Sequence, residues 1–301
     1  MTGSGAQISM AVSAPRHYPA SFPRQSSAMA RKTTEIADTF EPVEIIPGRN
    51  GGGVLFLCDH ARPSLPACYG DLGLPASAFH RHIAYDIGAA HVTRHLARIF
   101  DAPAILTTFS RLLIDPNRGE DDPTLVMRLS DGAIIPGNRD ADAAEIARRV
   151  ENYWRPYRIA VSAQIDAMLS TGKVPAILSI HSMTHAWKGI ARPWQVAVLW
   201  DSDPRLPLPF MARMALGPGL TIGDNEPYDG ALEGDTMDEH TTKRGLASLL
   251  IEVRQDLIGT PAQAEQWAER LAGPLREVLA LPGVHEVRHF GSRTRPSPQS
   301  K

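Results

Sequence analysis

The chain has 301 residues, of which 43% are hydrophobic and 21% are charged, an ordinary composition for a globular protein with a full core. Its formal net charge of -2 gives no overall excess of positive charge that would favour nucleic acid or an anionic membrane surface. No uncharged apolar run approaches the roughly twenty residues of a membrane span, and two cysteines make no disulfide framework, which favours a reducing cytoplasm.

Residues 1–40 differ from the rest of the chain. They are rich in Ser, Ala, Pro, Gly and Arg, lack apolar periodicity and contain no apolar core of a secretory signal, so we expect a disordered segment. Within it, Met29 is an alternative start of the natural protein. We expect residues 41–285 to form a single domain and residues 286–301 to form a basic tail.

Apolar runs and helical spacing alternate through the expected domain. In chain order we expect a strand at 54–58, a helix at 82–100, a strand at 104–109, a long functional loop at 119–140, a helix from 141 to about 170, strands at 176–180 and 195–200, a short helix at 208–216, a polar loop at 223–230, a strand at 247–251 and a closing helix at 261–279. This alternation predicts an α/β fold, a three-layer α/β/α sandwich around a mixed, mainly parallel sheet.

Several expected strands lead into residues that do chemistry. His60, His181 and Glu252 each come at the end of an apolar run, and the strand at 104–109 leads into Arg111. The carboxyl ends of parallel strands meet at one edge of a sheet, where ligands bind. We therefore expect these side chains to converge on one crevice.

Two histidines and a carboxylate are a typical set of zinc ligands that leaves one position for water, whose pKa the metal lowers to about 7. A further carboxylate that is not a ligand would take the proton of that water and return it to the departing nitrogen. Asn117 and Arg118 suit a substrate carboxylate, because amide and guanidinium groups bind it through charge-assisted hydrogen bonds. The residues are scattered, and no short motif of the HExxH type carries the signal.

At these residues the chain resembles the N-formylglutamate amidohydrolase family, a distant relation of the zinc carboxypeptidases and of aspartoacylase and succinylglutamate desuccinylase. The resemblance covers roughly residues 50 to 275 and lies in Asp59-His60-Ala61, Asp86-Ile87-Gly88-Ala89, Ser110-Arg111-Leu112 with Asp115-Pro116-Asn117-Arg118, Trp154-Arg155-Pro156-Tyr157, Ile180-His181-Ser182, His240 and Ile251-Glu252-Val253-Arg254-Gln255-Asp256. It implies a phosphorylase/hydrolase-like fold, a divalent metal and hydrolysis of a linear amide such as N-formyl-L-glutamate, usually in amino-acid degradation.

The resemblance also implies roles for single residues. His60 and His181 match the metal histidines of the family, and Glu252 falls where the related carboxypeptidases keep their general base. Asn117 and Arg118 resemble the pair that holds the substrate carboxylate in aspartoacylase-like enzymes.

Arg111 would be a second cationic contact and His240 a contact to the substrate or the transition state. The chain departs from the carboxypeptidases at Pro63, where they have a glutamate ligand three positions after the first histidine. The third ligand must then come from elsewhere, with Asp86 as the first choice and Asp59 as the second.

Simpler interpretations stay open at this stage. Asp86 could be a residue that favours a helix start through the helix dipole, and His240 could be a solvated loop residue. We assign no function to the remaining residues of interest, and expect them at the surface or in packing: His80, His82, His91, His95, His185, Trp154 and Tyr157.

The sequence thus predicts a zinc-dependent amidohydrolase of a small-molecule N-acyl amino acid, with another divalent metal as an open choice and with no nucleic-acid or membrane partner. One alternative is a metal carboxypeptidase or deacylase with a different acyl group. The other is a metal-free protein that binds carboxylates on the same fold, to which Pro63 points.

Overall fold

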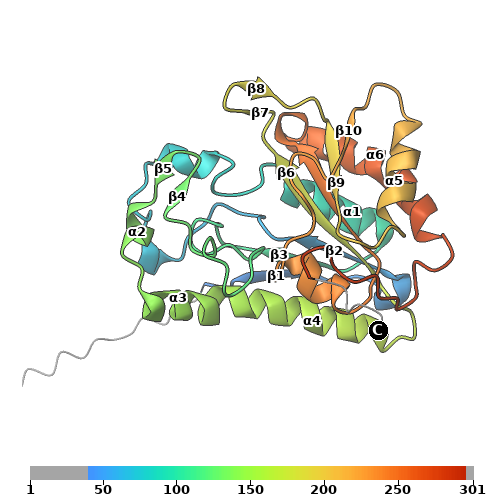
Figure 1. Cartoon of the computed structure of the whole chain (residues 1–301), viewed down its shortest axis with the longest axis horizontal. Helices are drawn as coiled ribbons and strands as arrows, with labels where there is room; N and C mark the ends of the chain where they lie inside the picture. The colour runs from blue at the N-terminus through green and yellow to red at the C-terminus, as the bar shows by residue number, and fades with distance from the viewer. Residues whose placement is uncertain (1–39, 296–301) are drawn as a thin grey trace, which may run out of the picture. The chain divides into compact units, whose positions relative to one another are not determined.

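A mixed, mainly parallel sheet lies at the centre of the fold. The structure is a computed structural model that describes residues 40–295, so nearly all of the expected disordered segment at 1–40 and the end of the expected tail lie outside the described residues. Within this range, seven strands join in the order β1-β3-β2-β6-β11-β9-β10 (Figure 1). Neighbouring strands are parallel except at β1-β3 and β9-β11. The strands are β1 (Val43–Ile46), β2 (Val54–Cys58), β3 (Ala104–Thr107), β6 (Ala176–Met183), β9 (Val196–Leu199), β10 (Ile222–Asp224) and β11 (Ser248–Arg254).

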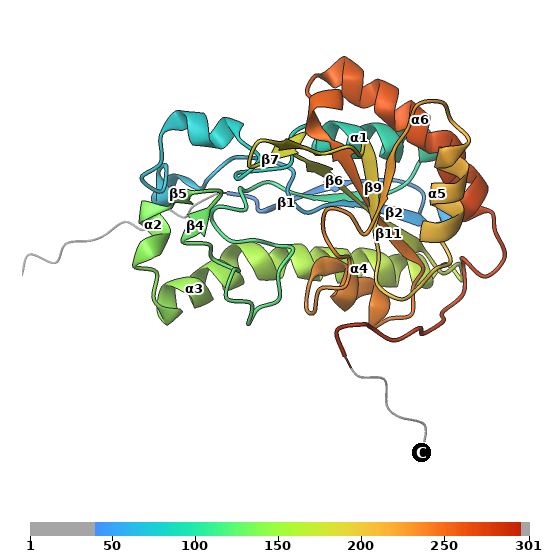
Figure 2. The same ribbon diagram turned by 45° about the horizontal axis from the view of Figure 1, so that its top comes forward.

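Helices cover both faces of this sheet, as Figure 2 shows for α1 and α6 on one side and α4 on the other. Phe56 of β2 packs in the core cluster under α1, α5 and α6, whereas its neighbours Leu55 and Leu57 pack against α4. The alternation of side chains along a strand therefore fills two cores. The result is the expected three-layer α/β/α sandwich. The covering helices are α1 (Ala89–Phe100), α4 (Arg155–Leu169), α5 (Pro207–Ala215) and α6 (Pro261–Leu279).

The helix expected from 141 to about 170 is divided into two. It consists of α3 (Ala143–Arg149), a wider π turn at Val150–Trp154, and α4. Pro156 has no N–H to donate to the preceding turn, and the Arg155 N–H reaches back to the Val150 carbonyl instead. The sequence pattern was helical throughout and did not reveal this change in winding.

The helix expected at 82–100 begins at Ala89, and Asp86 lies in the turn before it rather than in its first turns. Gly88 has a φ of 83°, a conformation that favours glycine, and a Cβ there would lie 2.1 Å from the Ile258 carbonyl oxygen. The chain therefore turns at Gly88 before it enters the helix. The Asp86 N–H donates to the His60 carbonyl at 2.9 Å, which places Asp86 beside the end of β2.

His181 and Glu252 lie inside their strands and not after them, because β6 and β11 pair up to Met183 and Arg254. The sequence patterns missed β1 and β10, and β10 begins next to the expected polar loop. The expected loop at 119–140 contains some structure of its own, and a second small hairpin follows β6. These elements are the hairpin β4 (Leu129–Ser130) and β5 (Ala133–Ile134), the short helix α2 (Pro136–Arg139), and the hairpin β7 (Ala186–Trp187) and β8 (Ile190–Ala191).

None of the helices between residues 40 and 295 combines the length and the apolarity that crossing a bilayer requires.

Candidate active site

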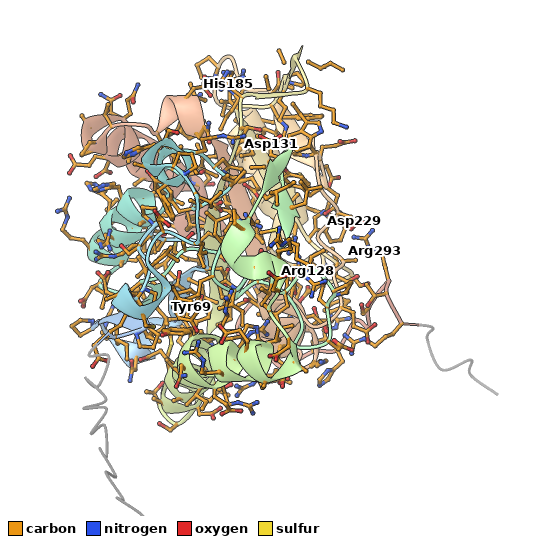
Figure 3. The ribbon with its side chains drawn as sticks, turned by 90° about the vertical axis from the view of Figure 1, so that its left-hand side faces the viewer. Tyr69, Arg128, Asp131, His185, Asp229 and Arg293 are labelled. Carbon is orange, nitrogen blue, oxygen red and sulfur yellow. The ribbon has the colours of Figure 1, made fainter. Side chains whose placement is uncertain are left out.

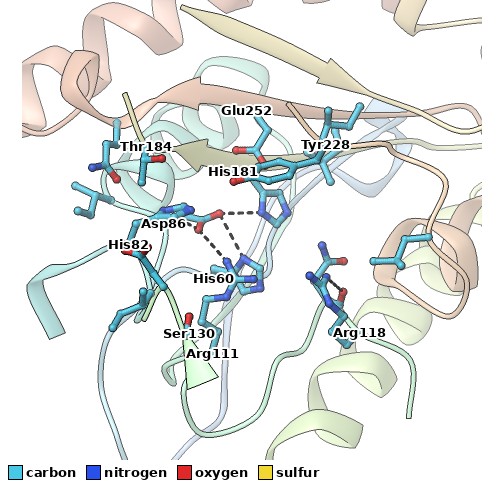
Figure 4. Close-up of a pocket in the computed structure, with 18 of the residues that line it drawn as sticks. His60, His82, Asp86, Arg111, Arg118, Ser130, His181, Thr184, Tyr228 and Glu252 are labelled. Carbon is cyan, nitrogen blue, oxygen red and sulfur yellow. Dashed lines mark hydrogen bonds and ion pairs between the residues drawn. The ribbon is translucent and has the colours of Figure 1, made fainter. Parts of the chain in front are cut away.

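A cavity of about 640 Å³ opens where β2, β3, β6 and β11 carry their functional side chains. Ligand pockets of small-molecule enzymes have this size. Most of the residues singled out in the sequence line it, and they are drawn in Figure 4. Its polar and charged lining includes His60, His82, Asp86, Arg111, Asn117, Arg118, His181 and Glu252.

His60, Asp86 and His181 form a buried group that could hold a metal ion, with one ligand atom of each within 4.8 Å of the others. Nδ1 of His181 lies 2.8 Å and Nδ1 of His60 lies 3.4 Å from the same atom, Oδ2 of Asp86. The two imidazole rings stand at 82° to each other. Both rings therefore present the same nitrogen to one carboxylate oxygen, as the dashed lines of Figure 4 show.

The outer nitrogens of both rings are held by two other carboxylates. Nε2 of His60 lies 2.8 Å from Asp115 Oδ1, and Nε2 of His181 lies 2.9 Å from Asp59 Oδ2. Such outer hydrogen bonds fix the orientation of histidine ligands and raise their basicity. Asp59 thus lies behind His181, away from the Nδ1 atoms that face Asp86.

The charges around this group favour a cation. Burial lowers the pKa of His181, but its hydrogen bonds to Asp59 and Asp86 outweigh burial and hold the pKa well above the ordinary value. Burial raises the pKa of Asp86, but the neighbouring histidines outweigh burial and hold it well below the ordinary value. Oδ1 of Asp86 is buried and has no hydrogen-bond partner. A donor set of this kind fits a divalent metal, which would replace the proton of His181.

Glu252 lies next to this group on the neighbouring strand, in register with His181. Its Oε2 atom is buried without a hydrogen-bond partner. Burial, with a contribution from the Asp86 charge, raises the pKa of Glu252 to about 7. A carboxyl group with this pKa can both accept and return a proton near neutral pH.

Arg111 is bound to the carboxylates of the site. Its Nη2 donates to Asp115 Oδ2 at 2.8 Å, and its Nη1 lies 3.6 Å from Asp86 Oδ1. The side chain lines the cavity, and 16% of it is exposed. A guanidinium held in this way offers a fixed positive charge beside the group that contains Asp86.

Arg118 lies across the cavity from Asp86 (Figure 4), and Asn117, its neighbour in the chain, also lines the cavity. Oδ1 of Asn117 accepts from the Thr236 N–H at 3.1 Å, and Arg118 Nη1 donates to the Asn117 carbonyl at 2.8 Å. Nε of Arg118 donates to Thr124 Oγ1 at 3.2 Å and lies 4.0 Å from Asp122 Oδ2, beyond hydrogen-bond distance. Nη2 of Arg158 holds the Arg118 carbonyl at 3.0 Å, so the backbone below this pair is fixed.

His240 is not brought to the cavity. It lies in the turn Asp238–Thr242, is 2% exposed, and its Nδ1 is 3.3 Å from Ser162 Oγ on α4. Burial lowers its pKa to about 4. The geometry therefore gives no support for the expected contact to substrate, because the turn packs His240 against α4.

His82 is a cavity residue that the sequence reasoning assigned to the surface or to packing. Its Nδ1 lies 3.5 Å from Asp86 Oδ1, and 19% of its side chain is exposed. Burial lowers its pKa to about 4, so the ring is neutral at pH 7. In the sequence, the spacing of four residues between His82 and Asp86 could have indicated that the two side chains lie together, but the segment was assigned to the helix expected at 82–100.

The chain is similar to known proteins in sequence and in fold. A family model described as N-formylglutamate amidohydrolase matches residues 52–259. Among solved structures, a gene product of Agrobacterium tumefaciens is 33% identical, with a TM-score of 0.75, and the match covers 80% of this chain and 96% of that one. An N-formylglutamate amidohydrolase from Ralstonia eutropha has the same fold, with 22% identity, a TM-score of 0.58 and coverage of 79% and 97%. No curated protein matches the chain.

Proposed function

Because this chain belongs to the N-formylglutamate amidohydrolase family, and is a hydrolase of amide bonds, we propose that it hydrolyses N-formyl or short N-acyl amino acids, N-formyl-L-glutamate among them, with the help of a divalent metal. One observation carries the proposal. The buried group of His60, Asp86 and His181 shares a cavity with an unpartnered carboxyl group, that of Glu252.

In this proposal His60, Asp86 and His181 hold the metal, with Zn²⁺ as the first choice. Two imidazoles and one carboxylate are the protein ligands of many catalytic zinc sites. When bound, the metal would polarise the amide carbonyl and lower the pKa of water at the site. Asp86 provides the carboxylate that Pro63 does not, which favours this enzyme over the metal-free binding protein.

Glu252 accepts a proton from the attacking water and returns it to the nitrogen of the departing amine. A pKa of about 7 suits both transfers, because the group is neither a strong acid nor a strong base at neutral pH. Arg111 stabilises the negative charge that develops on the amide oxygen, an effect typically worth about 3 to 4 kcal/mol for one well-placed donor.

Arg118 and Asn117 bind the free carboxylate of the substrate. Within residues 40–295 no carboxylate lies within hydrogen-bond distance of Arg118, whose Nε donates to Thr124 Oγ1 at 3.2 Å. The Asn117 amide keeps its NH₂ group as a donor because Oδ1 already accepts from the Thr236 N–H. A carboxylate at this position would orient the scissile amide between the metal group and Glu252.

The first test is metal content by elemental analysis of the purified protein, together with release of free amine from N-formyl amino acids. We expect near-stoichiometric metal and activity in the natural chain. The double variant His60→Ala, His181→Ala should have neither, and a His91→Ala, His95→Ala variant is the matched control, because neither of these residues lines the cavity. A protein that is active after complete removal of metal would contradict the proposal.

A further inference from the structure

Tyr228 brings a hydroxyl group to the site. The residue lines the cavity and lies beside His181 and Glu252 in Figure 4. Of its surface, 41% is exposed, which leaves it open to a ligand in the cavity. The roles proposed for the metal ligands and for Glu252 leave this hydroxyl unused.

The hydroxyl of Tyr228 is held by a cation. Nη2 of Arg192 donates to it at 2.9 Å, and the guanidinium carbon of Arg192 lies 5.1 Å from the centre of the ring, within the range of a cation–π contact. Because the hydroxyl oxygen accepts from Arg192, its own hydrogen can donate elsewhere, and no acceptor for it lies within hydrogen-bond distance in residues 40–295. The hydroxyl is therefore a donor that a neighbouring positive charge polarises.

This donor keeps its proton at neutral pH. Burial raises the pKa of Tyr228 and outweighs the opposite effect of the hydrogen bond from Arg192. The charges of Glu252 and Arg111 act on the same pKa, so the hydroxyl lies among the charged groups of the site.

The charge of Arg192 is buried and has no counter-charge. Arg192 is 7% exposed, its Nη1 has no hydrogen-bond partner, and within residues 40–295 no carboxylate forms an ion pair with it. The acidic residues at the rim of the cavity are bound to other arginines. Asp131 pairs with Arg81 at 2.6 Å. Asp229 pairs with Arg293 at 2.6 Å, and Figure 3 shows these two side by side. A buried cation of this kind stabilises negative charge that develops nearby.

Arg111, the donor proposed for the charge on the amide oxygen, is already neutralised. Its Nη2 donates to Asp115 Oδ2 at 2.8 Å, and its Nη1 lies 3.6 Å from Asp86 Oδ1. A guanidinium that two carboxylates share has less positive potential left for a substrate. A second donor, backed by a cation without a carboxylate, would therefore complement Arg111.

Backbone contacts hold both Arg192 and Tyr228 in place. Arg192 follows the hairpin of β7 and β8, where its N–H donates to the His185 carbonyl at 2.8 Å and its carbonyl accepts from Arg254 Nη1 at 3.1 Å. The loop that carries Tyr228 is fixed by Asn225, whose Oδ1 accepts from two backbone N–H groups. A donor that is fixed before the substrate binds needs no reorganisation during the reaction.

We propose, on the premise that the function proposed for this site holds, that Tyr228 is a catalytic residue whose hydroxyl donates a hydrogen bond to the amide oxygen as that oxygen becomes negatively charged. Arg192 is a positioning residue that holds and polarises this hydroxyl. The hydrogen bond is stronger in the transition state than with the neutral substrate, so it raises kcat more than it lowers KM.

The first test is Tyr228→Phe, which keeps the ring and removes only the hydroxyl. The assay uses the metal-loaded protein and the better substrate of N-formyl-L-glutamate and N-formylglycine. We expect kcat to fall about 10²-fold or more, whereas KM changes less than about threefold. Tyr69→Phe is the matched control, because the Tyr69 hydroxyl has no hydrogen-bond partner and does not line the cavity. This control should keep both constants.

Variants of Arg192 test its action through the hydroxyl. Arg192→Gln should lower kcat about tenfold or more, and Arg192→Lys, which keeps a positive charge, should have a higher kcat than Arg192→Gln. In the Tyr228→Phe background, Arg192→Gln should lower kcat less than about threefold further, because the hydroxyl through which it acts is absent. Thermal melting identifies a variant of Arg192 that does not fold, and Tyr228→Phe then decides on its own.

Three outcomes would contradict these roles. A kcat of Tyr228→Phe within about threefold of that of the natural chain would overturn the inference and leave the proposed function standing. A raised KM with an unchanged kcat would also overturn it, because Tyr228 and Arg192 would then bind a group of the substrate, such as a second carboxylate, equally in the ground and transition states. Additive effects of the two substitutions would remove Arg192 from its role. Failure of the natural chain to hydrolyse either substrate would instead contradict the proposed function, and with it this inference.

Discussion

Glu252→Gln is the sharpest perturbation of the proposed chemistry. The amide has nearly the shape of the carboxyl group but cannot accept and return a proton. Oε2 of Glu252 makes no hydrogen bond in the structure, so the substitution breaks none there. General acid–base catalysis contributes about 10² to 10⁴-fold to the rate of many enzymes, and we expect a loss of kcat in this range.

The same variant should fold at least as well as the natural chain. Burial first, and then the Asp86 charge, raise the pKa of Glu252 from 4.5 to about 7. The folded protein therefore binds the proton of Glu252 more tightly than the unfolded chain does. This proton binding stabilises the fold fully below pH 4.5, and the stabilisation is lost as pH rises through about 7, an effect of about 3 kcal/mol for the metal-free protein. Glutamine does not titrate, so metal-free Glu252→Gln should melt at an equal or higher temperature than the natural chain at pH 8.

The assay combines amine release between about pH 5 and pH 9 with metal analysis and thermal melting. In the natural chain kcat/KM should fall tenfold per pH unit below the pKa of Glu252, which a bound cation shifts below 7 because it favours the carboxylate. Glu265→Gln, a substitution on α6 at a side chain that is 58% exposed, is the matched control. If Glu252→Gln binds metal and keeps kcat within tenfold of the natural chain, Glu252 is not the base.

Two further substitutions test the groups around it. Asp115→Asn removes the negative charge that lies 2.8 Å from Nε2 of His60, and it should weaken metal binding about 10- to 100-fold in a chelator competition. The control Asp256→Asn, at a side chain that is 40% exposed, should not weaken metal binding. Equal metal affinities of the two variants would reject a supporting role for Asp115. Arg118→Gln should raise KM about tenfold or more with a smaller effect on kcat, because it removes a charge-assisted contact made equally in the ground and transition states. A substrate whose carboxylate is capped as an amide should be hydrolysed equally by this variant and by the natural chain, and discrimination that survives in the variant would place the carboxylate elsewhere.

The sequence predicted the sheet edge well because buried parallel strands have a strong signal. Val54–Cys58 and the first half of β6, from Ala176 to Ile180, are largely apolar and need no polar alternation, so His60 and His181 stood out just after them in the sequence. Glu252 stood out in the same way. These residues converge because β2, β6 and β11 are parallel neighbours, a feature that follows from the alternation of strands and helices.

The parts that failed depend on contacts that have no local pattern. The expected helix at 82–100 starts late because Gly88 passes close to Ile258, a residue from the far end of the chain. Because residues 82–88 are not part of the helix, both Asp86 and His82 can face the cavity. His240 differs in the opposite direction, because the family resemblance suggested a contact to substrate, whereas tertiary packing buries the side chain against α4.

Asp59 shows why the third metal ligand was ambiguous in the sequence. Its Oδ2 lies 2.9 Å from His181 Nε2 and accepts from Ser179 Oγ at 2.8 Å, while its Oδ1 accepts from the Tyr157 hydroxyl at 2.9 Å and from Thr236 Oγ1 at 2.7 Å. These contacts use the approximately four acceptor positions of a carboxylate, which supports Asp86 over Asp59 as the proposed ligand. Since Tyr157 lies on α4, the orientation of His181 depends on the packing of a helix against the sheet. Because Tyr157 and Asp59 lie far apart in the sequence, no motif of neighbouring residues predicts this contact, although each residue that takes part in it is visible in the sequence.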